Sequence, residues 1–123
     1  MLTGKIYTVE ELAGQPGHFG RMNSPDAASC VKGPCGDEME FYLVIRDDRI
    51  REISFFTAGC RDTVSCGEML SRLVEGTEIS VALGISPKQI GDKVRDLSPE
   101  HRHCLILAVN SFFNAVAGYM LMP

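Results

Sequence analysis

The chain has 123 residues, 45% of them hydrophobic, which is enough to form the core of one domain. Its formal net charge is −4, and its isoelectric point is near 5.3. This acidic balance argues against a nucleic-acid-binding protein, which usually carries a basic face. The start of the chain has no apolar run typical of a secretory signal. Five cysteines are an odd number, which disfavours a full disulfide framework, so we expect a cytoplasmic protein with reduced thiols.

The first predicted element is a short helix near the N-terminus. Thr8 and Glu11 have the spacing of a capping box, which predicts one or two helical turns over residues 9–13. Residues 14–25 are rich in glycine, proline, asparagine and serine, a composition typical of a loop. We therefore divide the chain into an N-terminal segment, residues 1–25, and a single domain, residues 26–123.

Three strands are predicted next. Ala27–Lys32 forms a short strand that a Gly-Pro pair ends. Glu38–Arg46 alternates between apolar and mixed positions, as a half-buried strand does, and an Asp-Asp turn leads to a returning strand over residues 49–57. The second and third strands therefore form a β-hairpin.

Helices fill the rest of the chain. The predicted helices run from about residue 60 to 74, from a Thr77 cap to residue 83, from a Ser86 capping box with Pro87, and from residue 99 to 120. This order predicts an α+β fold, with a small three-stranded antiparallel sheet, helices on one face and a long C-terminal helix. The apolar stretch 105–122 is shorter than the ~20 residues of a membrane span and includes polar residues, so we interpret it as a buried helix.

Five potential metal ligands lie near the ends of these elements: Cys35, Asp37, Cys60, His103 and Cys104. The start of one antiparallel strand lies beside the end of the next, so Cys35 and Cys60 are expected to meet at one edge of the hairpin. Thiolates, an imidazole and a carboxylate can hold tetrahedral zinc or a [2Fe–2S] cluster. The residues alone leave both possibilities open.

Each of these residues also has an ordinary explanation. A lone buried cysteine often serves as a small apolar residue. Asp37 follows a glycine as turn residues do, and His103 has the character of a surface histidine. No Cys-X-X-Cys pair is present. Cys30 and Cys66 are interpreted as structural, and the sequence assigns no role to His18.

The ordered motifs Gly33-Pro34-Cys35-Gly36-Asp37, Gly59-Cys60 and His103-Cys104 resemble those of IscU/NifU-type iron–sulfur cluster assembly scaffolds, the NifU-like N-terminal domain. The resemblance implies a scaffold, not an enzyme, that receives sulfur from a cysteine desulfurase and passes a transient [2Fe–2S] cluster to apo iron–sulfur proteins. It implies Cys35, Cys60 and Cys104 as ligands, with Cys104 the first sulfur acceptor. Asp37 and His103 are the remaining ligand candidates, Asp37 promotes release, and zinc binds the same site.

One departure from the family pattern shapes the remaining expectations. Residues 97–101 read Leu-Ser-Pro-Glu-His, where family members carry a Leu-Pro-Pro-Val-Lys segment that an Hsp70-type chaperone binds. The resemblance therefore does not by itself predict that an Hsp70-type chaperone binds this chain. The alternatives are a zinc-stabilised binding module and a sulfur carrier that uses Cys104 alone. Neither a nucleic acid nor a membrane is expected as a partner.

Overall fold

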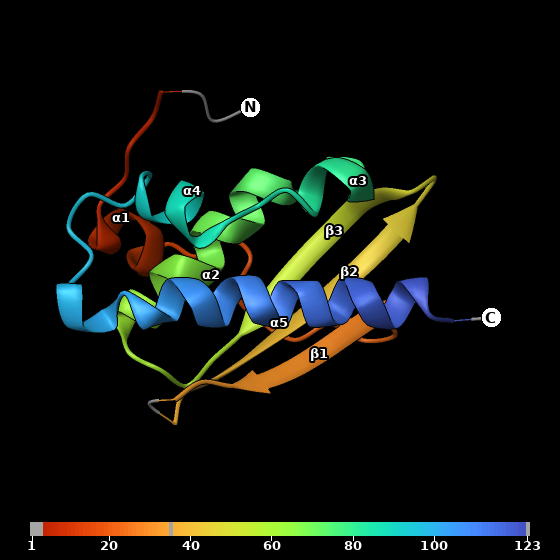
Figure 1. Ribbon diagram of the computed structural model, residues 1–123, viewed down its shortest axis with the longest axis horizontal. Coiled ribbons are helices and arrows are strands. Elements are labelled where there is room, and N and C mark those ends of the chain that lie inside the picture. The colour runs from red at the N-terminus through yellow and green to blue at the C-terminus, as the bar shows by residue number, and fades with distance from the viewer. Residues whose placement is uncertain (1–3, 35, 123) are drawn as a thin grey trace.

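The computed structural model describes residues 4–34 and 36–122. In chain order the elements are α1 (Val9–Gly14), β1 (Ala27–Lys32), β2 (Glu38–Arg46), β3 (Arg49–Phe56), α2 (Arg61–Val74), α3 (Ile79–Ala82), α4 (Pro87–Gly91), a 3-10 turn (Pro99–His101) and α5 (His103–Met120). Figure 1 shows α5 running the length of the molecule across the strands.

The sheet has the order β1-β2-β3, and both pairs are antiparallel. The β2–β3 hairpin turns at Asp47 and Asp48, whose φ angles are 54° and 60°. Two successive left-handed residues are the requirement of a type I′ turn, whose twist matches that of the flanking strands, and aspartate tolerates this conformation. The predicted hairpin is confirmed, and β3 ends one residue earlier than expected.

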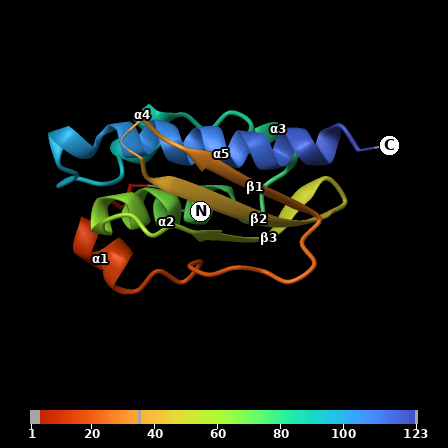
Figure 2. The same ribbon diagram turned by 90° about the horizontal axis from the view of Figure 1, so that it is seen from below.

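Two helices cover the same face of this sheet (Figures 1 and 2). Phe41 of β2 and Phe55 of β3 are directly paired, so their side chains point to the same face. Phe41 contacts Phe112 of α5, with ring centroids 6.0 Å apart, and Phe55 lies against Gly67 of α2. The α+β fold with helices on one face and a long C-terminal helix is therefore as predicted, and the core lies between these helices and the sheet.

The N-terminal segment covers the outer edge of β3. The Phe55 N–H donates to the His18 carbonyl oxygen at 2.9 Å, and the Gly20 N–H donates to the Phe55 carbonyl oxygen at 2.8 Å. The Phe19 ring packs edge-on against Phe55, with centroids 5.4 Å apart. The unpaired edge of the sheet is thus capped by the loop that follows α1. The division at residue 25 remains a prediction.

Two predicted helix starts are wrong in detail. Thr77 does not cap α3, because its hydroxyl donates back to the Val74 carbonyl oxygen at 2.7 Å and α3 begins only after Glu78. The last helix is not continuous from Pro99, since a 3-10 turn precedes α5. The stretch 99–120 is long and apolar enough to cross a membrane, but half of it is buried inside the protein, as in a core helix.

Candidate metal and cluster site

The first cysteine of the described site begins α2. Cys60 is the N-cap residue, with φ −73° and ψ 179°, and its side chain makes no capping hydrogen bond. Serine, threonine, aspartate or asparagine at such a position typically contributes about 1 kcal/mol to helix stability. A cysteine forgoes most of this stabilisation, so helix formation alone does not account for Cys60.

Thr63, one turn into α2, connects the candidate ligands. Its fully buried hydroxyl oxygen lies 3.1 Å from the Asp37 Oδ2 and 3.3 Å from the Cys104 Sγ. The Cys60 Sγ is 3.5 Å from the same oxygen. The structure therefore gathers Asp37, Cys60 and Cys104, which come from three distant parts of the chain, around one hydroxyl group.

These three side chains differ in exposure. Cys60 is exposed, Asp37 is partly buried and Cys104 has no accessible surface. The Cys104 thiol therefore does not open to solvent, because the second residue of α5 already faces the core. A reagent in solvent can reach the Cys60 sulfur directly but reaches Cys104 only if the surrounding chain moves.

Backbone geometry places Asp37 over the start of α2. The Gly33 N–H donates to the Asp37 carbonyl oxygen at 2.7 Å, and Gly36 has a φ of 94°, a conformation that favours glycine. A Cβ atom on Gly59 would lie 2.9 Å from the Asp37 Oδ2 and 2.8 Å from the Thr63 Oγ1. The absence of a side chain at Gly59 is what lets the two loops approach this closely.

Asp62 fixes the start of α5 beside α2. Its Oδ2 accepts a hydrogen bond from the Ser98 N–H at 3.2 Å and lies 2.8 Å from the His101 Nδ1. These contacts hold the turn that leads into His103 and Cys104. The Cys104 thiol reaches Thr63 because this turn is anchored one residue before Thr63.

His103 contributes an unusual nitrogen atom. The residue is partly buried, and its Nε2 is buried with no hydrogen-bond partner among the described residues. A buried polar atom without a protein partner is destabilising unless an ordered water or a bound ion takes that place. The neighbouring His101 ring lies 6.2 Å away, centroid to centroid, and its Nδ1 is held by Asp62. His103 is therefore the imidazole that remains available.

The described residues do not by themselves form a closed metal cage. Over residues 4–34 and 36–122, no group of three His, Cys, Asp or Glu side chains lies close enough together to hold a metal ion. Cys35 lies outside the described residues, so its role stays a prediction. The chemistry of the donor set, with thiols, a carboxylate and an imidazole at neighbouring element ends, suits zinc or an iron–sulfur cluster.

A cavity of about 280 Å³ adjoins Asp37 on the strand side. Arg21 and Glu40 lie on its wall, with the Arg21 Nε 2.9 Å from the Glu40 Oε1. The Arg21 guanidinium also lies over the Phe56 ring, 4.0 Å from its centroid. This cavity opens next to the candidate site and has a mostly polar, charged lining.

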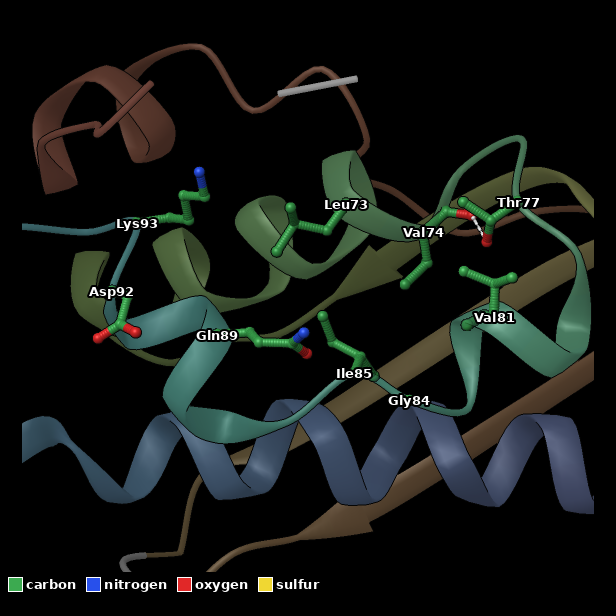
Figure 3. A pocket seen from close by; sticks show the side chains of 10 residues that line it. Leu73, Val74, Thr77, Val81, Gly84, Ile85, Gln89, Asp92 and Lys93 are labelled. Carbon is green, nitrogen blue, oxygen red and sulfur yellow. Dashed lines mark hydrogen bonds between the residues drawn. The ribbon is translucent and has the colours of Figure 1, made fainter. Parts of the chain in front are cut away.

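A second cavity, of about 390 Å³, lies at the other end of α2 (Figure 3). Its lining includes apolar side chains of Leu73, Val74, Val81 and Ile85. Because α2 has 14 residues, its two ends are about 20 Å apart. None of the candidate ligands lines this cavity, so it is separate from the site.

Sequence reasoning missed the residues that support the site. Thr63 and Asp62 follow Cys60 at spacings of three and two, but their side chains are informative only once the loops are placed.

His18, which was given no role, has its Nδ1 2.8 Å from Glu68 and its Nε2 2.8 Å from Glu75. Glu68 and Glu75 lie 50 and 57 residues after His18, so no local sequence pattern indicates that these side chains meet.

The two remaining cysteines are not among the candidate ligands. Cys66 is fully buried in α2, and burial raises the pKa of its thiol, which fits a structural role. Cys30 lies on β1 as predicted, but its side chain is exposed. Partial burial and the nearby Glu38 carboxylate, 3.5 Å from its sulfur, raise the pKa of the Cys30 thiol.

Comparison with known proteins shows the family to which the chain belongs. The family described as NifU-like N terminal domain matches residues 7–122, so the chain belongs to that family. The chain is 30% identical over 105 residues to the iron–sulfur cluster assembly scaffold protein IscU 1 of Archaeoglobus fulgidus, covering 85% of this chain and 69% of that protein. It is also 30% identical over 94 residues to the IscU scaffold protein of Aquifex aeolicus, covering 75% and 60%.

Solved structures share the fold. A NifU-like protein (N-terminal) from Brucella abortus superposes with a TM-score of 0.75 at 17% identity, covering 94% of this chain and 93% of that one. A putative iron–sulfur cluster assembly scaffold protein for the SUF system from Fervidobacterium islandicum gives a TM-score of 0.73 at 15% identity, covering 88% and 93%. The predicted resemblance to IscU/NifU-type scaffolds is confirmed.

Proposed function

We propose that this protein is a scaffold that assembles a labile [2Fe–2S] cluster and transfers it to apo iron–sulfur proteins. The observation that carries the proposal is the gathering of Asp37, Cys60 and Cys104 around Thr63. The residue before Cys104, His103, has an Nε2 that bonds no described residue. Membership of the NifU-like family, whose curated relatives are named as cluster assembly scaffolds, supports the same function. The cluster is the cargo of the protein rather than a permanent cofactor.

We assign the cluster ligands to Cys35, Cys60 and Cys104, with Asp37 and His103 as candidates for the fourth position. Two irons bridged by sulfide need four protein donors. A carboxylate is a hard ligand and a poor match for iron–sulfide, so Asp37 makes the cluster easier to release than an all-cysteine set would. His103 is ready to coordinate because no described residue bonds its Nε2.

Sulfur delivery by a cysteine desulfurase begins the proposed cycle, and an external two-electron reductant then converts the delivered persulfide sulfur to the sulfide of the cluster. A cysteine thiolate of the scaffold attacks the outer sulfur of the desulfurase persulfide, a new S–S bond forms on the scaffold, and the desulfurase cysteine leaves as a thiolate. No electrons are gained or lost in this step. We assign the first acceptor to Cys104, although its sulfur is fully buried, so the loop that carries Asp37 or the start of α5 must move to admit the donor.

The scaffold provides ligands rather than catalysis, and we propose a cytoplasmic location, where thiols stay reduced. The segment that would bind an Hsp70-type chaperone is altered, and part of it is engaged: the Ser98 N–H and the His101 Nδ1 both contact Asp62. Chaperone-independent transfer is therefore the expected route.

A zinc-stabilised binding module is the second candidate function. It is favoured by the same donor set, because three thiols with a carboxylate or an imidazole form a tetrahedral zinc site. Bound zinc that iron cannot replace would distinguish this module from the scaffold. A sulfur carrier acting through Cys104 alone would carry persulfide there even after Cys35→Ser.

The proposal is tested by anaerobic reconstitution with ferrous iron and sulfide, followed by addition of an apo-ferredoxin. The scaffold should develop visible absorption, lose it rapidly to a chelator, and restore the spectrum of the ferredoxin. Variants Cys60→Ser and Cys104→Ser should lose the chromophore while keeping a cooperative unfolding transition. Correctly folded wild-type protein that forms no chromophore would refute the proposal.

A further inference from the structure

The Thr63 hydroxyl differs from the other buried hydroxyl groups of α2 in its partners. The Ser65 hydroxyl donates to the Asp62 carbonyl oxygen at 2.7 Å, and the Ser71 hydroxyl donates to the Gly67 carbonyl oxygen at 2.8 Å. Both bonds stay within the helix. Among residues 4–34 and 36–122, the Thr63 hydroxyl instead contacts candidate ligands: Asp37, Cys104 and the N-cap residue Cys60, at 3.1, 3.3 and 3.5 Å.

Counting donors and acceptors explains how one hydroxyl can serve three groups. A threonine hydroxyl donates one hydrogen bond and accepts two. The carboxylate of Asp37 can only accept, so the single Thr63 proton is directed to it. The two oxygen lone pairs then face the sulfur atoms of Cys60 and Cys104, each within the range of a weak S–H donor. All three contacts are compatible at once, and the hydroxyl is fully used.

The same contacts close the site over Cys104. Thr63 and Cys104 are both fully buried, and the Thr63 oxygen contacts both the Cys104 sulfur and the Asp37 carboxylate. The loop carrying Asp37 can lie this near because Gly59 has no side chain. The hydrogen bond from Thr63 to Asp37 thus links the loop that carries Asp37 to α2, the helix that Cys60 caps.

We propose that Thr63 is the positioning residue of the site: its hydroxyl holds Asp37 against the two thiols, keeps Cys104 covered, and sets the arrangement into which the metal cargo binds. The identification of the cargo rests on the proposed function, but the positioning role does not. A structural role for Thr63 would need only its methyl group and volume, whereas the positioning role needs its oxygen atom.

The first test measures how fast iodoacetamide labels Cys104 in metal-free, reduced protein, read for each cysteine by mass spectrometry. Thr63→Val keeps the shape and removes the hydroxyl, and it should raise the labelling rate of Cys104 about fivefold, the effect of losing one net hydrogen bond. Thr63→Ser restores the oxygen and should label within about twofold of the wild type. Thr77→Val, which loses a hydroxyl at the other end of α2, is the matched control and should leave Cys104 unchanged.

Asp37→Ala breaks the same link from its other side and provides an independent arm. It should raise Cys104 labelling by a similar factor, and the double variant with Thr63→Val should show no further increase, because both changes remove one interaction. If Thr63→Val fails to fold, Asp37→Ala alone still decides whether this link covers Cys104. Labelling that is unchanged in the single variants, or that multiplies in the double variant, would overturn the proposal.

The second test uses Co²⁺ as the probe and follows its thiolate charge-transfer band. Residues that orient metal ligands typically change affinity 10- to 100-fold, so Thr63→Val should weaken Co²⁺ binding about 10-fold while Thr63→Ser stays near the wild type. If Thr63→Ser binds Co²⁺ as weakly as Thr63→Val does, the methyl group rather than the oxygen determines the affinity, and the positioning role is rejected. If the wild type forms no iron–sulfur cluster but the labelling results hold, the proposed function fails and the role of Thr63 stands.

Discussion

The N-terminal loop is held to α2 by a histidine that binds two carboxylates, and this makes the stability of the protein depend on pH. The His18 Nδ1 is 2.8 Å from the Glu68 Oε2, and the His18 Nε2 is 2.8 Å from the Glu75 Oε1. Only a protonated imidazole can donate from both nitrogens; a neutral one would turn a lone pair toward a carboxylate. The hydrogen bond to Glu68 raises the pKa of His18 to about 9 against the opposing effect of burial, and Glu75 adds to the increase.

The size of the effect follows from the change in pKa between the unfolded and folded states. A rise from 6.5 to about 9 corresponds to roughly 3 kcal/mol, at about 1.4 kcal/mol for each pKa unit. Because the folded pKa is the higher one, this stabilisation is complete below pH 6.5 and is lost as the pH rises from 6.5 through 9. Glu68 acts at the other end of the range. Burial opposes its ionisation, but hydrogen bonds from His18 and Arg72 outweigh this and lower its pKa, so its contribution is lost only as the pH falls into the acidic range.

The measurement is urea unfolding of reduced protein at pH 6.5 and pH 9.5, for the wild type and for His18→Gln. The variant should be less stable than the wild type by about 2–3 kcal/mol at pH 6.5 and by much less at pH 9.5. Lys88→Gln also removes a positive charge but only from an exposed pair with Asp92, so it should change stability by less than about 0.5 kcal/mol at either pH. Cysteine ionisation affects both proteins alike and cancels in the difference. An equal loss at both pH values would refute the argument, since the charge on His18 would then not matter.

Two further predictions concern contacts of α2 and the lability of the cluster. Gly67→Ala should destabilise the protein by more than about 2 kcal/mol in urea unfolding, although alanine favours helices, because the added Cβ would lie 2.5 Å from the Phe55 ring; a neutral or stabilising effect would show that this interface can yield. Asp37→Ala should lengthen the half-life of a reconstituted cluster in the presence of chelator several-fold. It should lower the free energy of unfolding by only about 1 kcal/mol, the value of the lost hydrogen bond to Thr63. A shorter half-life would argue that Asp37 retains the cluster rather than releasing it.

The sequence predicted most of the fold because its signals were local. The alternation along Glu38–Arg46 and the Asp47-Asp48 turn specify a hairpin, and the Ser86 capping box is present as expected, with the Gln89 N–H bonded to the Ser86 hydroxyl. The predicted Thr77 cap is wrong because a different local contact competes with it. Its hydroxyl had a nearer acceptor in the preceding helix, the Val74 carbonyl oxygen.

The sequence predicts a set of candidate ligands but not their arrangement. Cys60 and Cys104 lie next to residues that mark the starts of helices, so the sequence could indicate that both lie at helix ends. Nothing in the sequence showed that Cys104 would be buried, because the second residue of a helix faces the core or solvent according to how the preceding turn is anchored. That anchor is Asp62, and the connecting hydroxyl is Thr63; both depend on contacts between segments about 40 and 26 residues apart.

The most direct test of the scaffold function is the content of iron, zinc and acid-labile sulfide in protein purified without oxygen. A cluster scaffold should contain iron and sulfide in about equal amounts, as a [2Fe–2S] cluster does, and Cys60→Ser and Cys104→Ser variants that remain folded should lose both. Tightly held zinc with no sulfide, unchanged by exposure to iron and sulfide, would contradict the scaffold function and favour the zinc-stabilised module.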